Sequence, residues 1–335
     1  MQMNYLVTGG GGFLGGRIVR RLLERGDSVV ILGRKPQPEL QALGAEVIQG
    51  SMVDGGIVEN AVRGCDAVFH VAAKAGVWGN WKSFYEPNVL GTENVLNACK
   101  RNGIRYFVYT STPSVVYNGE PFEGEDENLS YGKNWICHYA HTKAIAEKKV
   151  LETHDMEDLR TCALRPHLIW GAGDPHLLPR VIETAGKGRL PIVGNGENRV
   201  DITHVDNAAD AHLLAMESLV SGGAACGKAY FLSQGEPVQL WPWINALLER
   251  VGVEPIRKRV SLKKAFCAGA FLEGLWKLGL PGEPPLTRFA SVELAKSHWF
   301  NISAARRDLG YDPKVSNEQG LEEFIAWYQE KKHEH

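Results

Sequence analysis

The stretch Thr8-Gly9-Gly10-Gly11-Gly12-Phe13-Leu14-Gly15 follows the aliphatic run Tyr5 to Val7 and leads directly into a segment of helical period. Of its glycines, Gly9 permits a tight turn, Gly12 lets a pyrophosphate approach the backbone, and Gly15 allows close packing of helix against strand. The N-terminus of the helix would then face the anion. The glycine spacing is weak evidence alone, but the strand, turn and helix together predict a dinucleotide-binding site.

The segment after the turn places Leu14, Ile18 and Leu22 on one stripe and ends near Gly26, as an amphipathic helix packed on a sheet does. Short β-branched or aliphatic runs then alternate with helical segments, which predicts an α/β fold: a Rossmann-like, doubly wound parallel sheet. The runs are Tyr5–Thr8, Ser28–Leu32, Glu46–Gly50, Ala67–Val71, Tyr106–Thr110 and Thr161–Ile169.

After Trp170 the sequence becomes rich in loop-forming residues, which suggests a smaller, discontinuous substrate domain in the C-terminal half. We expect a dinucleotide-binding domain over residues 1–171, rejoined by a helix and a strand at about 205–233. Residues 172–204 and 234–330 would form the substrate-binding domain.

Composition narrows the function classes. The 37 basic and 39 acidic residues nearly balance, so a nucleic-acid surface has no support and a small-molecule partner is expected. Six scattered cysteines without a C-x-x-C pair argue against zinc and against a disulfide framework, and the histidines lack ligand spacing, so we assign no metal. The sequence begins without an export signal or transmembrane segment, which predicts a cytoplasmic protein.

The end of the second predicted strand indicates which dinucleotide binds. An acidic residue there would accept hydrogen bonds from the ribose hydroxyls of NAD, whereas a basic residue would meet the 2′-phosphate of NADP. Here the strand runs into Gly33-Arg34-Lys35, with no carboxylate. Because a guanidinium can bind phosphate in bidentate fashion, Arg34 and Lys35 favour NADP(H), although both could instead belong to a solvated loop.

Tyr139 and Lys143 are four residues apart, so on a helix they share one face. A neighbouring cation favours phenolate and lowers the tyrosine pKa, which predicts Tyr139 as a proton donor and acceptor. The strand Tyr106–Thr110 opens into Ser111-Thr112, and hydroxyls at that end of a parallel strand lie where ligands bind. Thr112 could therefore hydrogen-bond a substrate carbonyl.

Together the glycine turn, the Thr110-Ser111-Thr112 strand end and Tyr139-x-x-x-Lys143 resemble an extended short-chain dehydrogenase/reductase over nearly the whole chain. The chain is similar to the 3β-hydroxysteroid dehydrogenase group, and within it to the bacterial reductases of 2-alkyl-3-oxoalkanoates in long-chain olefin biosynthesis. The segments that carry this resemblance are His70–Gly79, Tyr109–Val115, Leu164–Gly171 and Leu286–Phe289.

The resemblance implies NADPH-dependent reduction of a long-chain 2-alkyl-3-oxoalkanoate to the 2-alkyl-3-hydroxyalkanoate. It makes Thr112, Tyr139, Lys143 and Asn88 the catalytic residues, with Lys143 also holding the nicotinamide ribose. A homodimer, and a complex with other olefin-pathway enzymes, are further implications. The implied cofactor-binding residues are Gly9, Gly12, Phe13, Leu14, Gly15, Arg34, Lys35, Ser51, Met52, Ala72, Ala73, Tyr139, Lys143, Pro166 and Leu168.

Two positions depart from the family pattern. The adenine-contacting aspartate usual after the third strand is replaced by Ser51, with Asp54 nearby, so which of them meets the adenine is open. Threonine replaces the commoner serine at position 112, but it keeps the hydroxyl.

Three other functions fit parts of the pattern. Oxidation of a 3β-hydroxysteroid, including a 4-carboxysterol, would use the same residues with NAD, and Arg34 argues against it. A dinucleotide-sensing or assembly protein without turnover would not need Thr112, Tyr139 and Lys143 together. Epimerase or dehydratase chemistry on a nucleotide-sugar is the third, but no diphosphate clamp is evident.

Two apolar segments are candidates for a substrate pocket. Trp78, Trp81, Phe84 and Tyr85 either wall a pocket at the sheet edge or pack in the core. The segment Ala265–Leu280 is too short and too charged to span a bilayer, and we expect a buried helix or a pocket lid there in preference to membrane contact.

Overall fold

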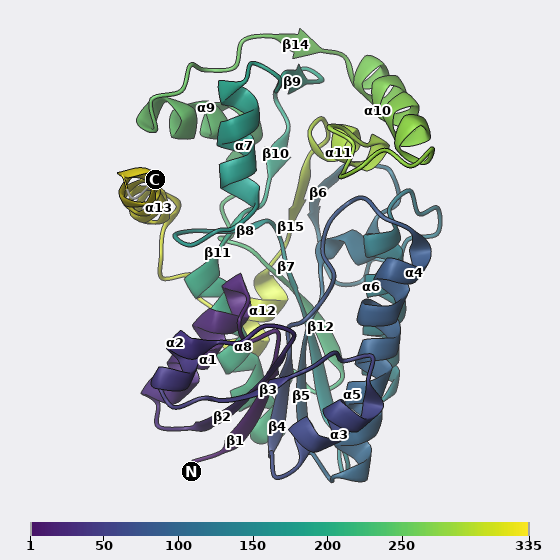
Figure 1. The fold of residues 1–335 in the computed structure, drawn as a ribbon, viewed down its shortest axis with the longest axis vertical. Helices are drawn as coiled ribbons and strands as arrows, with labels where there is room; N and C mark the ends of the chain where they lie inside the picture. The colour runs from purple at the N-terminus through teal and green to yellow at the C-terminus, as the bar shows by residue number, and fades with distance from the viewer. Residues whose placement is uncertain (1, 334–335) are drawn as a thin grey trace.

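A seven-stranded parallel sheet forms the centre of the computed structural model, which describes residues 2–333 (Figure 1). The strand order is β12-β7-β5-β4-β1-β2-β3, with β1 in the middle between β2 and β4. The strands are β1 (Asn4–Thr8), β2 (Ser28–Gly33), β3 (Glu46–Gln49), β4 (Ala67–His70), β5 (Tyr106–Thr110), β7 (Arg160–Pro166) and β12 (Lys228–Leu232). The predicted α/β class with a doubly wound parallel sheet is confirmed.

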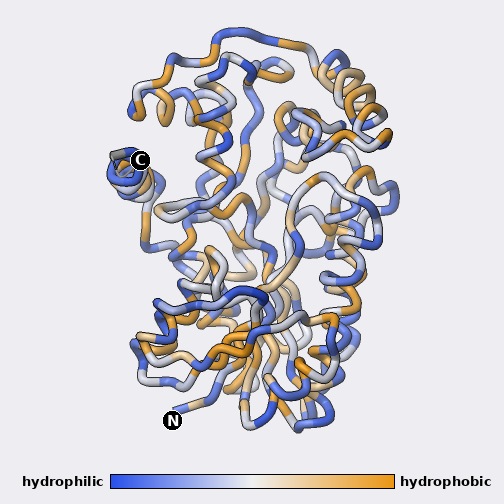
Figure 2. The backbone as a smooth tube through the Cα atoms, in the orientation of Figure 1, coloured by the Kyte–Doolittle hydropathy of each residue, from blue (hydrophilic) through white to orange (hydrophobic). Residues whose placement is uncertain are grey.

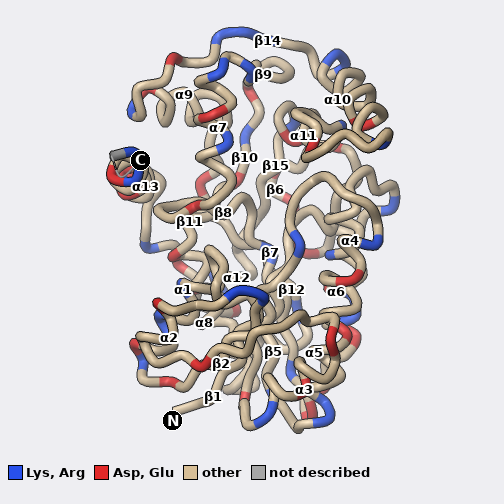
Figure 3. The backbone as a smooth tube through the Cα atoms, viewed as in Figure 1, with Lys and Arg blue, Asp and Glu red and all other residues tan. Residues whose placement is uncertain are grey.

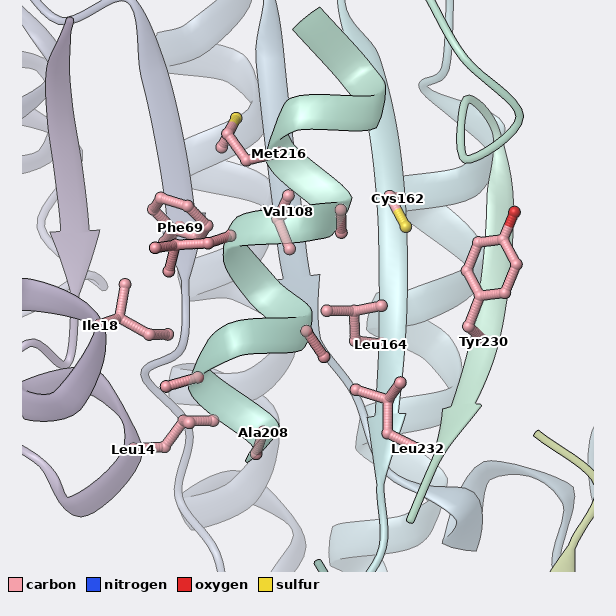
Figure 4. Close-up of a cluster of buried hydrophobic side chains, with 14 of the residues drawn as sticks. Leu14, Ile18, Phe69, Val108, Cys162, Leu164, Ala208, Met216, Tyr230 and Leu232 are labelled. Atoms are coloured by element: carbon pink, nitrogen blue, oxygen red, sulfur yellow. The ribbon is translucent and has the colours of Figure 1, made fainter. Parts of the chain in front are cut away.

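Helices cover both faces of this sheet because alternate strand residues point to opposite sides. On one face, Val7, Phe69 and Val108 pack with α1 (Phe13–Glu24) and α8 (Val205–Val220), as Figure 4 shows for part of this cluster. On the other face, Leu6 and Phe107 pack with three further helices. These are α3 (Gly55–Val62), α5 (Gly91–Arg101) and α6 (His138–Glu152).

A second, smaller body lies beyond the C-terminal ends of the sheet strands (Figure 1). It contains a four-stranded sheet of order β13-β10-β15-β6 and two pairs of short strands, β11 with β8 and β14 with β9. Its strands are β6 (Phe122–Glu125), β8 (Ile169–Trp170), β9 (Ile192–Val193), β10 (Arg199–Val200), β11 (Thr203–His204), β13 (Val238–Gln239), β14 (Arg259–Val260) and β15 (His298–Phe300). The helices around it include α7 (Leu177–Gly186), α9 (Leu240–Arg250), α10 (Leu262–Trp276), α11 (Arg288–Glu293) and α13 (Asn317–His333).

The remaining elements are short. They are α2 (Pro38–Ala42), α4 (Trp81–Tyr85), a π-helix (Glu86–Leu90), a 3₁₀ turn (Pro113–Val116) and α12 (Ser303–Leu309). Helix α12, near the C-terminus, packs on α8 and β12 beside the large sheet. Strand β6, from the first half of the chain, pairs with β15 in the smaller sheet. Each of the two bodies is therefore built from segments that are distant in sequence. The domain limits at residues 171, 205 and 233 remain a prediction.

The predicted strand Thr161–Ile169 is wrong at its end. Strand β7 stops at Pro166, and Leu168 has a φ of 41°, a left-handed conformation that interrupts an extended strand before β8 begins. The predicted return to the sheet is confirmed, since β12 pairs with β7 in parallel and α8 packs on α1.

Charge and hydropathy follow the layers. Apolar residues gather in the sheet (Figure 2), and basic and acidic residues are interspersed over the chain (Figure 3). Within residues 2–333, every helix is too short or too polar to cross a membrane.

Candidate active site

A cleft of about 830 Å³ lies at the C-terminal ends of the parallel strands, where open α/β sheets bind ligands. Thirteen of the residues expected to bind cofactor border it, including Tyr139 and Lys143. The other eleven are Gly9, Gly12, Phe13, Leu14, Gly15, Arg34, Lys35, Ser51, Met52, Ala72 and Ala73. Pro166 and Leu168 do not border the cleft, whereas their neighbour Ile169 does.

The glycine turn is shaped for close approach. Gly9 has a φ of 69°, and a Cβ there would lie 2.8 Å from the Cα of Ala72. A Cβ on Gly15 would lie 2.2 Å from the Gly9 carbonyl oxygen, so both positions require glycine. Helix α1 begins at Phe13 with Gly12 as an N-cap that makes no side-chain hydrogen bond, which leaves backbone N–H groups directed into the cleft. These features fit the pyrophosphate of a dinucleotide.

Arg34 and Lys35 are exposed at the cleft border directly after β2. Gln37 also borders the cleft, although no sequence pattern indicated it. Its side chain lies against the glycine turn, since a Cβ on Gly11 would be 2.0 Å from the Gln37 Nε2. Only the folded loop brings Gln37 back over the glycines. The three polar side chains together border the end of the cleft near β2.

The structure separates the roles of Ser51 and Asp54. Ser51 and Met52 border the cleft, whereas the Asp54 carboxylate caps α3 by accepting from the backbone N–H groups of Gly56 and Ile57 at 2.9 and 3.2 Å. Because capping occupies Asp54, Ser51 is the polar residue after β3 that remains available to an adenine.

Tyr139 lies in the first turn of α6, beside the Thr112 hydroxyl at the end of β5. Burial raises the pKa of Tyr139 to about 12, and the Thr112 hydroxyl lowers it in part. The expectation that Lys143 lowers this pKa is wrong. The Lys143 Nζ instead donates to the Thr110 carbonyl oxygen at 2.5 Å and lies 4.0 Å from the centre of the Tyr109 ring.

Lys143 is a buried cation, with 1% of its surface exposed. Burial lowers its pKa to about 7, and the carboxylate of Glu147, one helical turn further along α6, raises it in part. Glu147 is itself buried and pairs with the buried Arg165 of β7, which donates from Nε at 3.0 Å and from Nη2 at 2.5 Å. Tyr131 donates to the same carboxylate at 2.9 Å.

Asn88 does not border the cleft but is buried immediately behind it, in the π-helix Glu86–Leu90. Its side chain accepts from the backbone N–H of Lys74 at 2.7 Å and donates to the Lys74 carbonyl at 3.1 Å. The same amide nitrogen donates to the Thr142 hydroxyl at 3.1 Å. Asn88 thus joins the loop after β4 to α6 next to Tyr139, and π-helical turns often mark such functional positions.

A one-directional hydrogen-bond chain supports Asn88. The Thr92 hydroxyl donates to the Asn88 backbone carbonyl at 2.7 Å. Because the hydroxyl hydrogen is used in that bond, the Thr92 oxygen accepts from Nε2 of His70 at 2.9 Å. Nδ1 of His70 then accepts from the Thr8 hydroxyl at 2.8 Å, and Thr8 accepts from the Ala72 N–H at 3.2 Å. This arrangement requires neutral His70, whose pKa burial lowers to about 3. Sequence reasoning missed the chain, because its members are distant in sequence.

The predicted aromatic pocket wall is partly core. Phe84 is buried with 1% exposure, whereas Trp81 packs on α6, with ring centres 5.6 Å from His138 and 4.9 Å from His141. Tyr85 lies 5.5 Å from the Trp81 ring. These aromatic residues position the first turns of α6.

Helix α10 has two different faces. On its inner face, Phe266 packs in one apolar cluster with Phe289, Val77 and Tyr139, as a pocket lid would. Its outer face is exposed, with Phe271 at 67% exposure. The expectation of a buried helix is therefore wrong for the outer face.

Among residues 2–333, two groups of three side chains lie close enough together to hold a metal ion, although the sequence showed no ligand spacing. They are His167, Glu293 and His298, and His204, Asp206 and Glu323. In the first group, both His298 ring nitrogens are engaged within the protein, with His167 Nε2 at 2.6 Å and the Glu293 carbonyl at 2.8 Å. These contacts give this group a structural role.

The doubly wound sheet, the glycine turn and the Tyr139–Lys143 pair define an extended short-chain dehydrogenase/reductase. Residues 6–264 match the 3-beta hydroxysteroid dehydrogenase/isomerase family, and the chain belongs to this family. It is 50% identical over 327 residues to a 2-alkyl-3-oxoalkanoate reductase of Stenotrophomonas maltophilia, covering 97% of this chain and 99% of the relative. It is 36% identical to a 3 beta-hydroxysteroid dehydrogenase/Delta 5-->4-isomerase of Mycobacterium tuberculosis, over 96% of this chain and 90% of that one.

The fold also matches a solved dTDP-glucose 4,6-dehydratase from Streptomyces venezuelae, whose structure contains NAD. The TM-score is 0.78, with 24% identity and coverage of 99% of this chain and 98% of the other. At this identity the match supports the fold alone.

Proposed function

We propose that the chain reduces the 3-keto group of a long-chain 2-alkyl-3-oxoalkanoate to the 2-alkyl-3-hydroxyalkanoate with NADPH. The observation that carries the proposal is the meeting, at one cleft, of a glycine turn fit for pyrophosphate and the Tyr139 and Lys143 pair. The Thr112 hydroxyl is not part of the cleft lining but lies beside the Tyr139 phenol. The near full-length similarity to a 2-alkyl-3-oxoalkanoate reductase supports the substrate class.

NADPH is the proposed cofactor because Arg34 and Lys35 are exposed where a 2′-phosphate would lie, with no acidic residue in Gly33-Arg34-Lys35. When bound, the cofactor supplies hydride to C3 of the substrate. Lys143 would hold the ribose hydroxyls, and the N-terminus of α1 the pyrophosphate.

Tyr139 donates the proton to the ketone oxygen as negative charge develops there, and the Thr112 hydroxyl donates a hydrogen bond to the same oxygen. Because burial raises the Tyr139 pKa to about 12, the phenol is protonated at neutral pH. This is the form that can donate the proton during reduction. Asn88 fixes the Lys74 backbone and α6 relative to each other.

The test is to follow NADPH oxidation by the purified protein with a long-chain 2-alkyl-3-oxoacid and with a 3-oxosteroid in parallel. A UDP-sugar incubation is analysed separately for an epimerised or dehydrated product, because that chemistry consumes no NADPH. We expect turnover with the oxoacid and a clear preference for NADPH over NADH. Turnover confined to the steroid would favour the activity named for the mycobacterial relative, and turnover confined to the sugar would favour epimerase or dehydratase chemistry; either result would overturn the proposal.

A further inference from the structure

The outer face of α10 and the turn after it, residues 263–281, carry an apolar strip that other described segments leave uncovered. Phe271 is 67% exposed, Leu278 84% and Leu280 47%. In the part of the chain that the structure describes, six large hydrophobic side chains are exposed, and three of them lie within residues 271–280. The Trp276 indole donates to the Pro281 carbonyl at 3.2 Å and holds the turn that presents both leucines.

Positive charge flanks this strip. Lys263, Lys264 and Lys277 are exposed, and within residues 2–333 none of them pairs with a carboxylate. The one acidic residue of α10, Glu273, is buried on the inner face, where it accepts from Arg288 Nε at 2.8 Å. The exposed face is thus apolar and basic without an acidic residue. Figure 2 shows α10 as a largely hydrophobic coil at the outer edge of the molecule, and Figure 3 shows basic residues at its start.

The position of two of these lysines argues against a role in helix stability. Lys263 and Lys264 occupy the first turn of α10, where the positive end of the helix dipole disfavours cations. Ser261 already caps this end by accepting from the Lys264 N–H. The helix dipole therefore does not account for Lys263 and Lys264, whose side chains are exposed to solvent.

We propose that the outer face of α10 and its turn bind the surface of a bilayer that contains anionic lipid. An apolar strip that enters the acyl boundary, with lysines at the level of the headgroups, is the pattern of a helix that lies in the membrane interface. A protein partner fits less well, because lysine is depleted in the cores of protein interfaces. The binding of the bilayer does not depend on the proposed function, whereas its consequence for catalysis rests on that function.

The inner face of the same helix gives this surface a consequence for catalysis. Phe266 belongs to the apolar cluster that contains Tyr139 and Phe289. A helix with side chains is about 10 Å across, so a docked α10 separates the bilayer from that cluster by one helix. An apolar substrate that partitions into the membrane is thereby held about one helix diameter from the cluster that contains Tyr139.

Sedimentation with vesicles tests the surface directly. The full chain is mixed with vesicles of phosphatidylcholine alone, or of equal parts phosphatidylcholine and phosphatidylglycerol, and the bound fraction is measured at low and high salt. The apolar contact is removed by the double variant Phe271→Asp, Leu278→Asp and the charge by Lys263→Gln, Lys264→Gln. The matched control is Leu43→Asp, because Leu43 is 51% exposed but lies after α2 in the other half of the molecule.

We expect binding to the anionic vesicles that weakens with salt, and a loss of at least tenfold in the aspartate variant. Each lysine should contribute roughly fivefold, and Leu43→Asp should bind like the parent. Circular dichroism and thermal unfolding confirm that the exposed substitutions leave the fold intact. The proposal is overturned if the parent stays in the supernatant, if the aspartate variant binds equally, or if gel filtration shows that this variant only dissociates a dimer.

Discussion

Replacing Lys143 with methionine should stabilise the protein while impairing turnover. The ammonium is almost fully buried, and its contacts within the described residues are the Thr110 carbonyl and the face of the Tyr109 ring. Burial lowers the Lys143 pKa from its usual 10.5 to about 7, despite the nearby Glu147 carboxylate. The folded protein therefore disfavours the charged form that the unfolded chain carries at neutral pH.

The size of the effect follows from the pKa difference. Lowering a lysine pKa from 10.5 to about 7 corresponds to roughly 5 kcal/mol of cost for the charged form, at about 1.4 kcal/mol per pH unit. The variant also loses the hydrogen bond to the Thr110 carbonyl, which offsets about 1 to 3 kcal/mol of the stability gained by removing the charge. We expect Lys143→Met to raise the free energy of unfolding by on the order of 2 to 4 kcal/mol at or below about pH 7.

The sign of the pH dependence is fixed by which state binds more protons. The cost of burying the charge is fully present below the folded pKa of about 7. Between that pH and 10.5 the unfolded chain holds more protons than the native protein, so the parent gains stability as pH rises. The methionine variant lacks this gain, and the difference between the two proteins should shrink toward alkaline pH.

Urea unfolding at about pH 6, 8 and 10 measures this difference. Lys149→Met is the matched control on the same helix, because the Lys149 side chain is 40% exposed and pairs with Glu93 at 2.7 Å, a surface pair worth less than about 1 kcal/mol. Lys143→Met should also bind NADPH more weakly through the ribose. A methionine variant that is less stable than the parent near pH 6, or a difference that does not change with pH, would refute the reasoning.

Three further predictions concern the reaction. Tyr139→Phe should lower kcat about 10² to 10⁴-fold with NADPH binding intact. Thr112→Val should lower kcat less, because it removes a hydrogen bond to the ketone oxygen and not the proton donor. A near-normal kcat in Tyr139→Phe would mean that the spacing of Tyr139 and Lys143 is coincidental. Arg34→Asp should weaken NADPH binding by roughly 1.5 to 3 kcal/mol relative to NADH in a fluorescence titration, and equal affinities in the parent would contradict the NADP assignment. Substrate kcat/KM should rise by up to about fourfold, or about 0.8 kcal/mol, for each added methylene as the chain covers the apolar cluster of Phe266 and Phe289. A flat series would assign Phe266 to packing alone.

The sequence predicts best those features that depend on neighbours along the chain. The glycine turn follows from the order of strand, turn and helix, and Tyr139 and Lys143 share a face because of helical spacing. Asp54 shows where local reasoning stops. Whether it meets an adenine or caps a helix depends on where α3 begins, and the structure places it at the cap.

Long-range contacts account for the rest. His70 bonds to Thr8 across 62 residues and to Thr92 across 22, and no spacing rule connects them. The Tyr139 pKa was predicted in the wrong direction because helical spacing gives proximity but not side-chain direction or burial. The Lys143 ammonium donates to the Thr110 carbonyl. Burial of the phenol is therefore the largest influence on the Tyr139 pKa, and it raises that pKa.

Helix α6 shows how one local period organises the whole site. Tyr139, Lys143 and Glu147 follow at intervals of four residues, so they lie along one face at successive turns. The first turn presents the phenol to the cleft, the second buries an ammonium against β5, and the third fixes the helix to β7 through Arg165. Because Glu147 is held by Arg165 and also raises the Lys143 pKa, the same ion pair positions the helix and keeps part of the lysine population charged. The stability lost at Lys143 therefore lies one turn from the contact that fixes the helix, and the same Glu147–Arg165 pair that raises the Lys143 pKa holds α6 against β7.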